Sequence, residues 1–108
     1  MTVNELVSTG DFKPVTVPDG AREIRGAYCG DLLSWVMGRA RSGNAWITIM
    51  SNMNILAVAS LADVSCIIIA EGVELEPQII DTANSKGINI LSTMLGEYDT
   101  AVKLGNIL

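Results

Sequence analysis

Six residues of this 108-residue chain have the types and positions that could bind or transform a small molecule. Each follows a short apolar stretch, where a strand would end and a helix would begin. Amide side chains at such places both donate and accept hydrogen bonds, and carboxylates accept them. The six candidate ligand-binding residues are Asp31, Asn52, Asn54, Glu71, Gly72 and Thr93. They contain no recognisable catalytic set.

The residue types that are missing exclude several kinds of active site. The chain has no histidine, which removes histidine-based triads and most zinc sites. It has no P-loop sequence and no Gly-x-Gly-x-x-Gly after a strand. Glu71, Glu74 and Glu76 lie in one segment and could hold a cation, but a solvated acidic loop is the simpler interpretation, because hard-cation sites also need placed carbonyls and waters. We therefore expect no metal site and no cofactor.

Ordinary structural roles account for part of the candidate set. Asp31 precedes an apolar helical pattern, so capping of that helix is favoured over catalysis. Asn52 or Asn54 is expected to cap the next helix, which leaves the other amide for a ligand.

The two tryptophans are expected to have different surroundings. Trp46 is expected to fill the core. Trp35 falls off the main apolar stripe of its helix and is expected to face a partner chain.

Composition and charge limit the class of protein. A content of 49% hydrophobic and 18% charged residues is typical of one compact globular domain. The net charge is −5 and the basic residues are scattered, so neither nucleic acid nor an anionic membrane is an expected partner. No segment is typical of a signal peptide or a membrane span, and we expect a cytoplasmic protein. Cys29 and Cys66 are then expected to be free, buried thiols.

Short apolar stretches separated by turn residues predict the strands. The stretch at 66–70 is continuously apolar and rich in β-branched residues, as in the central strand of a parallel sheet. The segment 12–17 could be a strand, but Pro14 and Pro18 limit it to an edge or an arm. The other expected strands are 23–29, 45–50 and 88–91.

Helix boundaries are marked by a few local signals. Thr2 and Glu5 have the spacing of a capping box and predict a short first helix. Pro77 suits the first position of a helix, and Gly87 suits the position just after its end. The segment 55–62 is apolar nearly all round, which favours a buried helix, with a strand as the alternative.

Together these elements predict an α/β fold. The strand-break-helix unit occurs four times, so we expect a single domain with a mostly parallel four- to five-stranded sheet and helices on both faces. The four breaks then meet at the carboxyl edge of the sheet, where ligands bind in open α/β folds. We assign residues 1–21 to an N-terminal helix and arm and residues 22–108 to the α/β domain.

Five stretches of the chain resemble the DRTGG domain family, over roughly residues 22 to 105. They are 30–34, 46–48, 54–59, 66–72 and 83–93. The family takes its name from an Asp-Arg and a Thr-Gly-Gly segment at strand ends, which correspond here to 51–54 and 70–72. Only Gly72 remains of the second segment, and the first has no arginine. The resemblance implies a bacterial protein whose fold is similar to the N-terminal domain of Mur ligases.

The resemblance also implies a kind of function, because similar domains occur beside catalytic domains such as that of HPr kinase/phosphorylase. We expect a non-catalytic regulatory or protein-interaction module that forms a homodimer and binds a protein partner or a small molecule at the carboxyl edge of the sheet. The alternative is a small enzyme or transferase that uses Asp31, Asn52, Asn54 and Thr93 in the same crevice. An open crevice with a perturbed carboxylate would favour this alternative.

Overall fold

The computed structural model describes residues 1–108 and contains five strands and five helices. The strands form one sheet in the order β1-β5-β4-β3-β2, in which only β1 is antiparallel to its neighbour. The predicted α/β fold with a mostly parallel sheet is confirmed. In chain order the elements are α1 (Val3–Ser8), β1 (Lys13–Thr16), β2 (Ala27–Cys29), α2 (Leu33–Arg39), β3 (Ala45–Thr48), α3 (Asn54–Ala62), β4 (Cys66–Ile69), α4 (Pro77–Lys86), β5 (Ile90–Ser92) and α5 (Glu97–Ile107).

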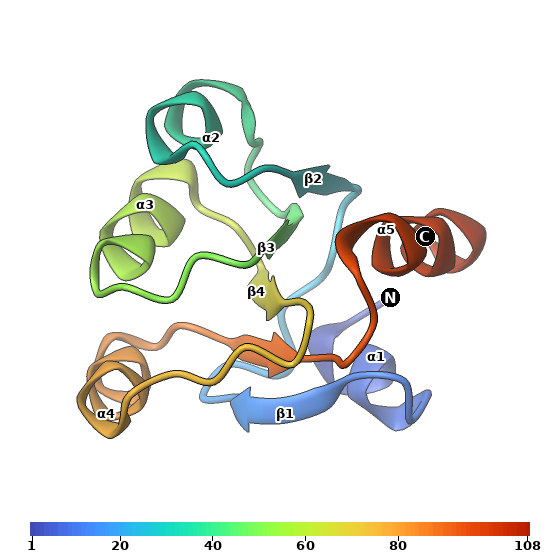
Figure 1. Cartoon of the computed structure of the whole chain (residues 1–108). Coiled ribbons are helices and arrows are strands. Elements are labelled where there is room, and N and C mark those ends of the chain that lie inside the picture. The colour runs from blue at the N-terminus through green and yellow to red at the C-terminus, as the bar shows by residue number, and fades with distance from the viewer.

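Helices cover both faces of the sheet. In Figure 1, α2, α3 and α4 lie on one side of the strands, and α1 and α5 lie on the other. Alternate side chains of β4 point to opposite faces, so Ile67 and Ile69 pack in the core under α2–α4, whereas Cys66 and Ile68 pack in the core under α1 and α5. All four are buried, which explains why this central strand is a continuous apolar stretch.

Local signals in the sequence set several element boundaries as predicted. The capping box begins α1: the Glu5 amide donates to the Thr2 hydroxyl at 3.1 Å, and the Thr2 amide donates to the Glu5 carboxylate at 2.8 Å. Pro77 opens α4, and Gly87, with φ of 73°, ends it. The segment with Pro14 forms the edge strand β1 and contains an irregularity in its pairing with β5.

Three predictions about single residues are wrong. Asp31 does not cap α2, whose N-cap is Leu32 without a side-chain hydrogen bond. Neither asparagine caps α3: the N-cap is Met53, and the Asn52 side chain instead accepts a hydrogen bond from the Asn54 amide at 2.9 Å. Both cysteines are free, but only Cys66 is buried. Cys29 is exposed because β2 is the outermost strand of the sheet.

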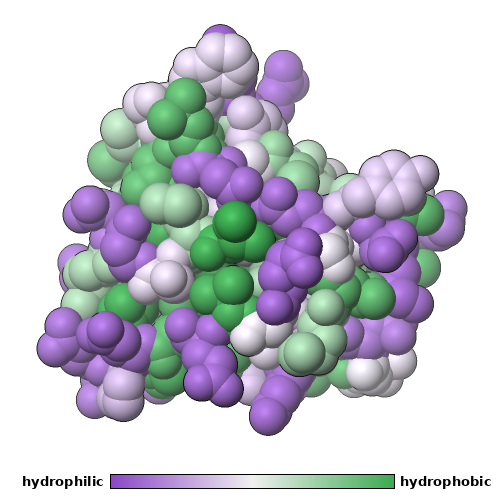
Figure 2. Space-filling view, in the orientation of Figure 1, coloured by the Kyte–Doolittle hydropathy of each residue, from purple (hydrophilic) through white to green (hydrophobic).

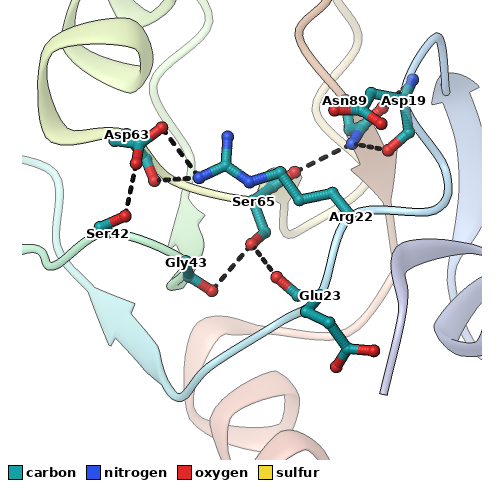
Figure 3. Close-up of polar contacts among 8 residues, drawn as sticks. All are labelled: Asp19, Arg22, Glu23, Ser42, Gly43, Asp63, Ser65 and Asn89. Carbon is teal, nitrogen blue, oxygen red and sulfur yellow. Dashed lines mark hydrogen bonds and ion pairs between the residues drawn. The ribbon is translucent and has the colours of Figure 1, made fainter.

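A buried polar network holds the segment before β2 against the amino end of the sheet (Figure 3). Asn89 is only 2% exposed. Its carbonyl oxygen accepts from the Asp19 amide at 3.0 Å, and its Nδ2 donates to the carbonyls of Asp19 and Ser65 at 2.8 and 3.0 Å. The Ser65 hydroxyl in turn contacts the carbonyls of Glu23 and Gly43. These bonds join segments that are far apart in the sequence.

Candidate functional site

A cavity of about 600 Å³ lies at the carboxyl ends of β4 and β5. Its walls come from β1 and the residues before it, from the segments that follow β4 and β5, and from α4. Pockets of about 300–1,000 Å³ are the usual size for small-molecule sites. The cavity is therefore large enough for a small ligand, at the edge of the sheet where the sequence predicts one.

The cavity combines an apolar wall with a polar rim. Apolar side chains make up part of the lining, and Ser92 and Thr93 add hydroxyl groups. The Thr93 hydroxyl accepts a hydrogen bond from the Leu95 amide at 3.1 Å, so its own proton remains available to a ligand. Lys13 contributes one positive charge and forms no ion pair within the chain. The apolar lining residues are Val15, Ile69, Val73, Leu75, Ile80 and Met94.

The turn after β4 shapes one wall of the cavity. Glu71 and Gly72 both have positive φ, 62° and 68°. Their amides donate to the carbonyls of Leu95 and Thr93 at 2.8 and 2.9 Å, which fastens this turn to the segment after β5. A Cβ on Gly72 would lie 2.7 Å from the sulfur of Met94, but Met94 is 83% exposed and its side chain can move aside. Glycine is therefore favoured here by its backbone conformation.

A second polar cluster joins the ends of β2 and β3 to the start of α5. Oδ1 of Asp31 accepts from the Thr48 hydroxyl at 2.8 Å and from the Ile49 amide at 2.9 Å. Burial raises the pKa of Asp31, but these two hydrogen bonds and one from Glu97 outweigh it, so the pKa lies below its usual value. Burial, the hydrogen bond to Asp31 and the charges of Asp31 and Glu71 raise the pKa of Glu97 to about 7.

The Glu97 carboxyl is thus suited to hold a proton at neutral pH. Its Oε1 is buried without a hydrogen-bond partner, which disfavours the ionised form. A protonated Glu97 can donate to Asp31 and so tie α5 to the end of β2. No group of three or more carboxylate or cysteine side chains is arranged to hold a metal ion.

Replacing Glu97 with glutamine is expected to reduce the pH dependence of stability. The pKa of about 7 in the folded protein exceeds the ordinary 4.5, so unfolding releases a proton between these values and stability falls as the pH rises from about 4.5 to about 7. Glutamine keeps a hydrogen-bond donor at every pH. Near pH 4.5 the two proteins should be equally stable, and near pH 8 the variant should be more stable by about 1 kcal/mol, a value reduced for the partial exposure of the group.

Urea unfolding at the two pH values measures this difference. A Glu97→Gln variant that is destabilised equally at both pH values would show that folding does not raise the pKa of the Glu97 carboxyl. Asp99 provides the control for replacing an acidic residue, because it lies in the same first turn of α5 as Glu97 but is exposed. Asp99→Asn should leave the pH profile of the wild type unchanged.

The structure brings two of the six sequence candidates, Gly72 and Thr93, into the cavity. Asp31 belongs to the cluster with Glu97. Glu71 lies next to the start of α5. Its Oε2 is 3.2 Å from the position that a Cβ atom would take on Gly96. The remaining candidates, Asn52 and Asn54, lie at the start of α3, outside the cavity lining.

Two parts of the site were missed from the sequence. The cavity wall formed by β1 depends on antiparallel pairing with β5, which sets Lys13 beside Ser92. No local pattern predicts that long-range pairing. Glu97 was also missed, although an acidic residue in the first turn of a helix is a recognisable signal.

The family comparison matches this chain to the DRTGG domain over residues 29–107. Because the match covers most of the sequence, the protein belongs to the DRTGG domain family. This agrees with the resemblance found in the sequence. A comparison with curated proteins gives no match. None of the helices has the length and hydrophobicity that crossing a membrane requires.

A solved structure of similar fold contains the CBS and DRTGG domains of the regulatory region of Clostridium perfringens pyrophosphatase, complexed with its activator, diadenosine tetraphosphate. The TM-score is 0.67 at 16% sequence identity. The similarity covers 95% of this chain and 45% of that chain, so the present chain spans less than half the length of its structural neighbour. At this level of identity the two share a fold.

Proposed function

We propose that this DRTGG domain is a non-catalytic regulatory module that binds a small ligand in the cavity at the carboxyl ends of β4 and β5. The observation that carries this proposal is the cavity itself, about 600 Å³ in volume, with an apolar wall and a hydroxyl-bearing rim. In open α/β folds this edge of the sheet is the usual place for a ligand. The structural neighbour is a regulatory region that was solved with an activator bound, which supports the same class of function.

The chemistry of the lining favours a nucleoside or a nucleoside monophosphate. The apolar wall suits a flat ring, and the hydroxyls of Ser92 and Thr93 suit the hydroxyls of a sugar. Lys13 is the single cation of the lining, and Glu74 adds a negative charge. Asp11 also lines the cavity, but its carboxylate is paired with Lys103 at 3.4 Å. One lysine opposite one free carboxylate leaves little net attraction for a polyphosphate. Adenosine should therefore bind at least as tightly as diadenosine tetraphosphate.

Replacing Val73 with tryptophan is expected to abolish adenosine binding, because the larger side chain would occupy the cavity. A ligand that binds only the folded state raises the melting temperature, so thermal unfolding with millimolar adenosine measures the effect. Leu61→Trp is the matched control, since Leu61 is 74% exposed on α3 and lies outside the cavity. Adenosine should stabilise the wild type and the control but not Val73→Trp. An equal shift in all three proteins would place binding elsewhere.

A small enzyme or transferase is the second candidate function. The raised pKa of Glu97, about 7, is the observation that favours it, because general acids and bases have such values. Glu97 is not among the residues that line the cavity, however, and its partner Asp31 is engaged by Thr48 and Ile49. The geometry therefore supports binding better than catalysis.

We further infer that the module is a homodimer. Large apolar side chains remain exposed on and next to α2, among them Trp35 at 54% and Leu32, the residue that precedes the helix, at 60%. On the face drawn in Figure 2, hydrophobic residues gather in the middle with hydrophilic residues around them. Exposed apolar surface of this kind is typical of association sites. Light scattering should give twice the 11.5 kDa mass of one chain, and a monomer at micromolar concentration would contradict the inference.

A further inference from the structure

Three acidic side chains come together beside the cavity without a basic residue between them. Glu97, in the first turn of α5, is hydrogen-bonded to Asp31, which follows β2. Glu71, in the turn after β4, has its Oε2 next to Gly96, the residue that precedes Glu97. None of the three carboxyl groups forms an ion pair with a lysine or an arginine. When α5 is in place, one of them is therefore expected to hold a proton.

The surroundings of Glu97 disfavour its ionised form from several sides. Its Oε1 is buried without a hydrogen-bond partner. From β2, Cys29 contributes only a neutral thiol, because burial and the charges of Glu97 and Asp31 raise its pKa. From the end of β3, the Thr48 hydroxyl and the Ile49 amide both donate to Asp31 and keep it ionised. An ionised Glu97 would thus place a second negative charge beside Asp31, with one oxygen shut off from water.

The segment between β5 and α5 connects this carboxyl pair to the wall of the cavity. Thr93 lines the cavity, and Glu97 follows it by four residues. The Leu95 amide donates to the Thr93 hydroxyl at 3.1 Å, and the Leu95 carbonyl accepts from the Glu71 amide at 2.8 Å. The Thr93 carbonyl accepts from the amide of Gly72, another lining residue, at 2.9 Å. A displacement of the start of α5 would therefore reach both sides of this wall through Leu95.

We propose that one proton held between Glu97 and Asp31 fastens the start of α5 and thereby keeps the cavity in its ligand-binding form. The proposal rests on the ligand site proposed above and adds its regulation by pH. With the proton bound, Glu97 donates to Asp31 and the first turn of α5 stays beside β2, where Figure 1 shows it. Loss of the proton places two carboxylates side by side, and their repulsion loosens the segment 93–96.

The direction of the pH effect follows from the pKa of Glu97. Burial is the largest cause that raises it to about 7 when α5 is in place, and in a loosened segment it returns towards the ordinary 4.5. Loosening therefore releases a proton and becomes easier as the pH rises from about 4.5 to about 7. Because only the fastened form binds the ligand well, the apparent affinity falls with the population of that form.

Hydrogen exchange of the ligand-free protein tests the fastening directly. The amides of Glu71, Gly72 and Leu95 make the bonds that hold the segment. Their protection, corrected for the chemical exchange rate at each pH, should fall about fivefold between pH 5.5 and pH 8, a value reduced for the partial exposure of Glu97. Glu97→Gln keeps a hydrogen-bond donor at both pH values, so its protection should not change. The control Asp99→Asn should behave as the wild type does, because Asp99 is exposed in the same turn.

Asp31→Asn tests the pair from its other side. The carbonyl oxygen of asparagine can still accept from Thr48 and Ile49, and its amide can donate to an ionised Glu97. A single negative charge then remains at the pair, so this variant should also lose the pH dependence, which a merely structural role of Asp31 does not predict. Wild-type amides that are equally protected at both pH values, or a fivefold loss that persists in both variants, would overturn the proposal.

Adenosine binding at the same two pH values tests the regulation. Adenosine is uncharged across this range, so a change in its affinity reports on the protein. The wild type should bind more weakly at pH 8 than at pH 5.5, and Glu97→Gln should bind equally at both. Equal affinity of the wild type at both pH values would overturn the regulation but leave the nucleoside site standing. An absence of binding at both would overturn the nucleoside site, while hydrogen exchange of the ligand-free protein still decides whether Glu97 fastens the cavity wall.

Discussion

Replacing Trp46 with alanine is expected to lower the free energy of unfolding by about 3–5 kcal/mol. Trp46 is fully buried in β3 and packs in the core between the sheet and α2–α4. Alanine would leave a cavity that the neighbouring side chains fill only in part. It would also remove the indole N–H that donates to the Gly30 carbonyl at 2.9 Å. Since domains of this size have about 5–15 kcal/mol of stability, the variant should be close to unfolding.

Trp46→Phe separates the two contributions. Phenylalanine keeps most of the ring volume but cannot donate to Gly30, so we expect a smaller loss of about 1–2 kcal/mol. Urea unfolding followed by circular dichroism measures both variants. If alanine cost no more than phenylalanine, the packing around Trp46 would contribute nothing, and the burial of this side chain would have to be reconsidered.

Asn89→Ala is expected to cost on the order of 3 kcal/mol, the second largest effect. The amide makes three hydrogen bonds, two with the backbone of Asp19 and one with the carbonyl of Ser65 (Figure 3). Alanine would leave these backbone groups without partners in a site that water reaches poorly. The segment before β2 would then lose its attachment to the amino end of the sheet. Hydrogen exchange should rise there first.

Asn52→Ala is the matched control for this prediction. The Asn52 side chain makes a single local hydrogen bond, to the Asn54 amide, and is exposed. Its removal should cost no more than about 0.5 kcal/mol. Equal losses in the two variants would show that the buried network stabilises the fold no more than an exposed turn does.

The parts of the fold that depend on local patterns could be predicted from the sequence. The apolar stretch from Cys66 marks a strand buried on both faces, and its alternating side chains do divide between two cores. Pro77 and Gly87 bound α4 because each residue favours one backbone conformation. The exposure of Trp35 also followed from its position off the apolar stripe of α2. Each of these predictions uses residues close together in the chain.

The parts that depend on distant residues could not be predicted. Lys13 reaches the cavity only because β1 pairs with β5, about eighty residues later in the chain. Asp31 is predicted to cap its own helix, but its carboxylate instead accepts hydrogen bonds from the Thr48 hydroxyl and the Ile49 amide at the end of the neighbouring strand β3. The raised pKa of Glu97 likewise depends on the packing of α5 beside β2, which brings it to Asp31. Tertiary contacts decide these roles.

Titration of isotope-labelled protein with adenosine, followed by amide chemical shifts, tests the central claim most directly. The account predicts that the shift changes concentrate at Gly72, Val73, Ser92 and Thr93, the residues that follow β4 and β5. The same titration of Val73→Trp should produce none of these changes. Shift changes that spare these residues, or a wild-type spectrum unchanged by adenosine, its monophosphate and diadenosine tetraphosphate alike, would contradict a nucleoside site in this cavity.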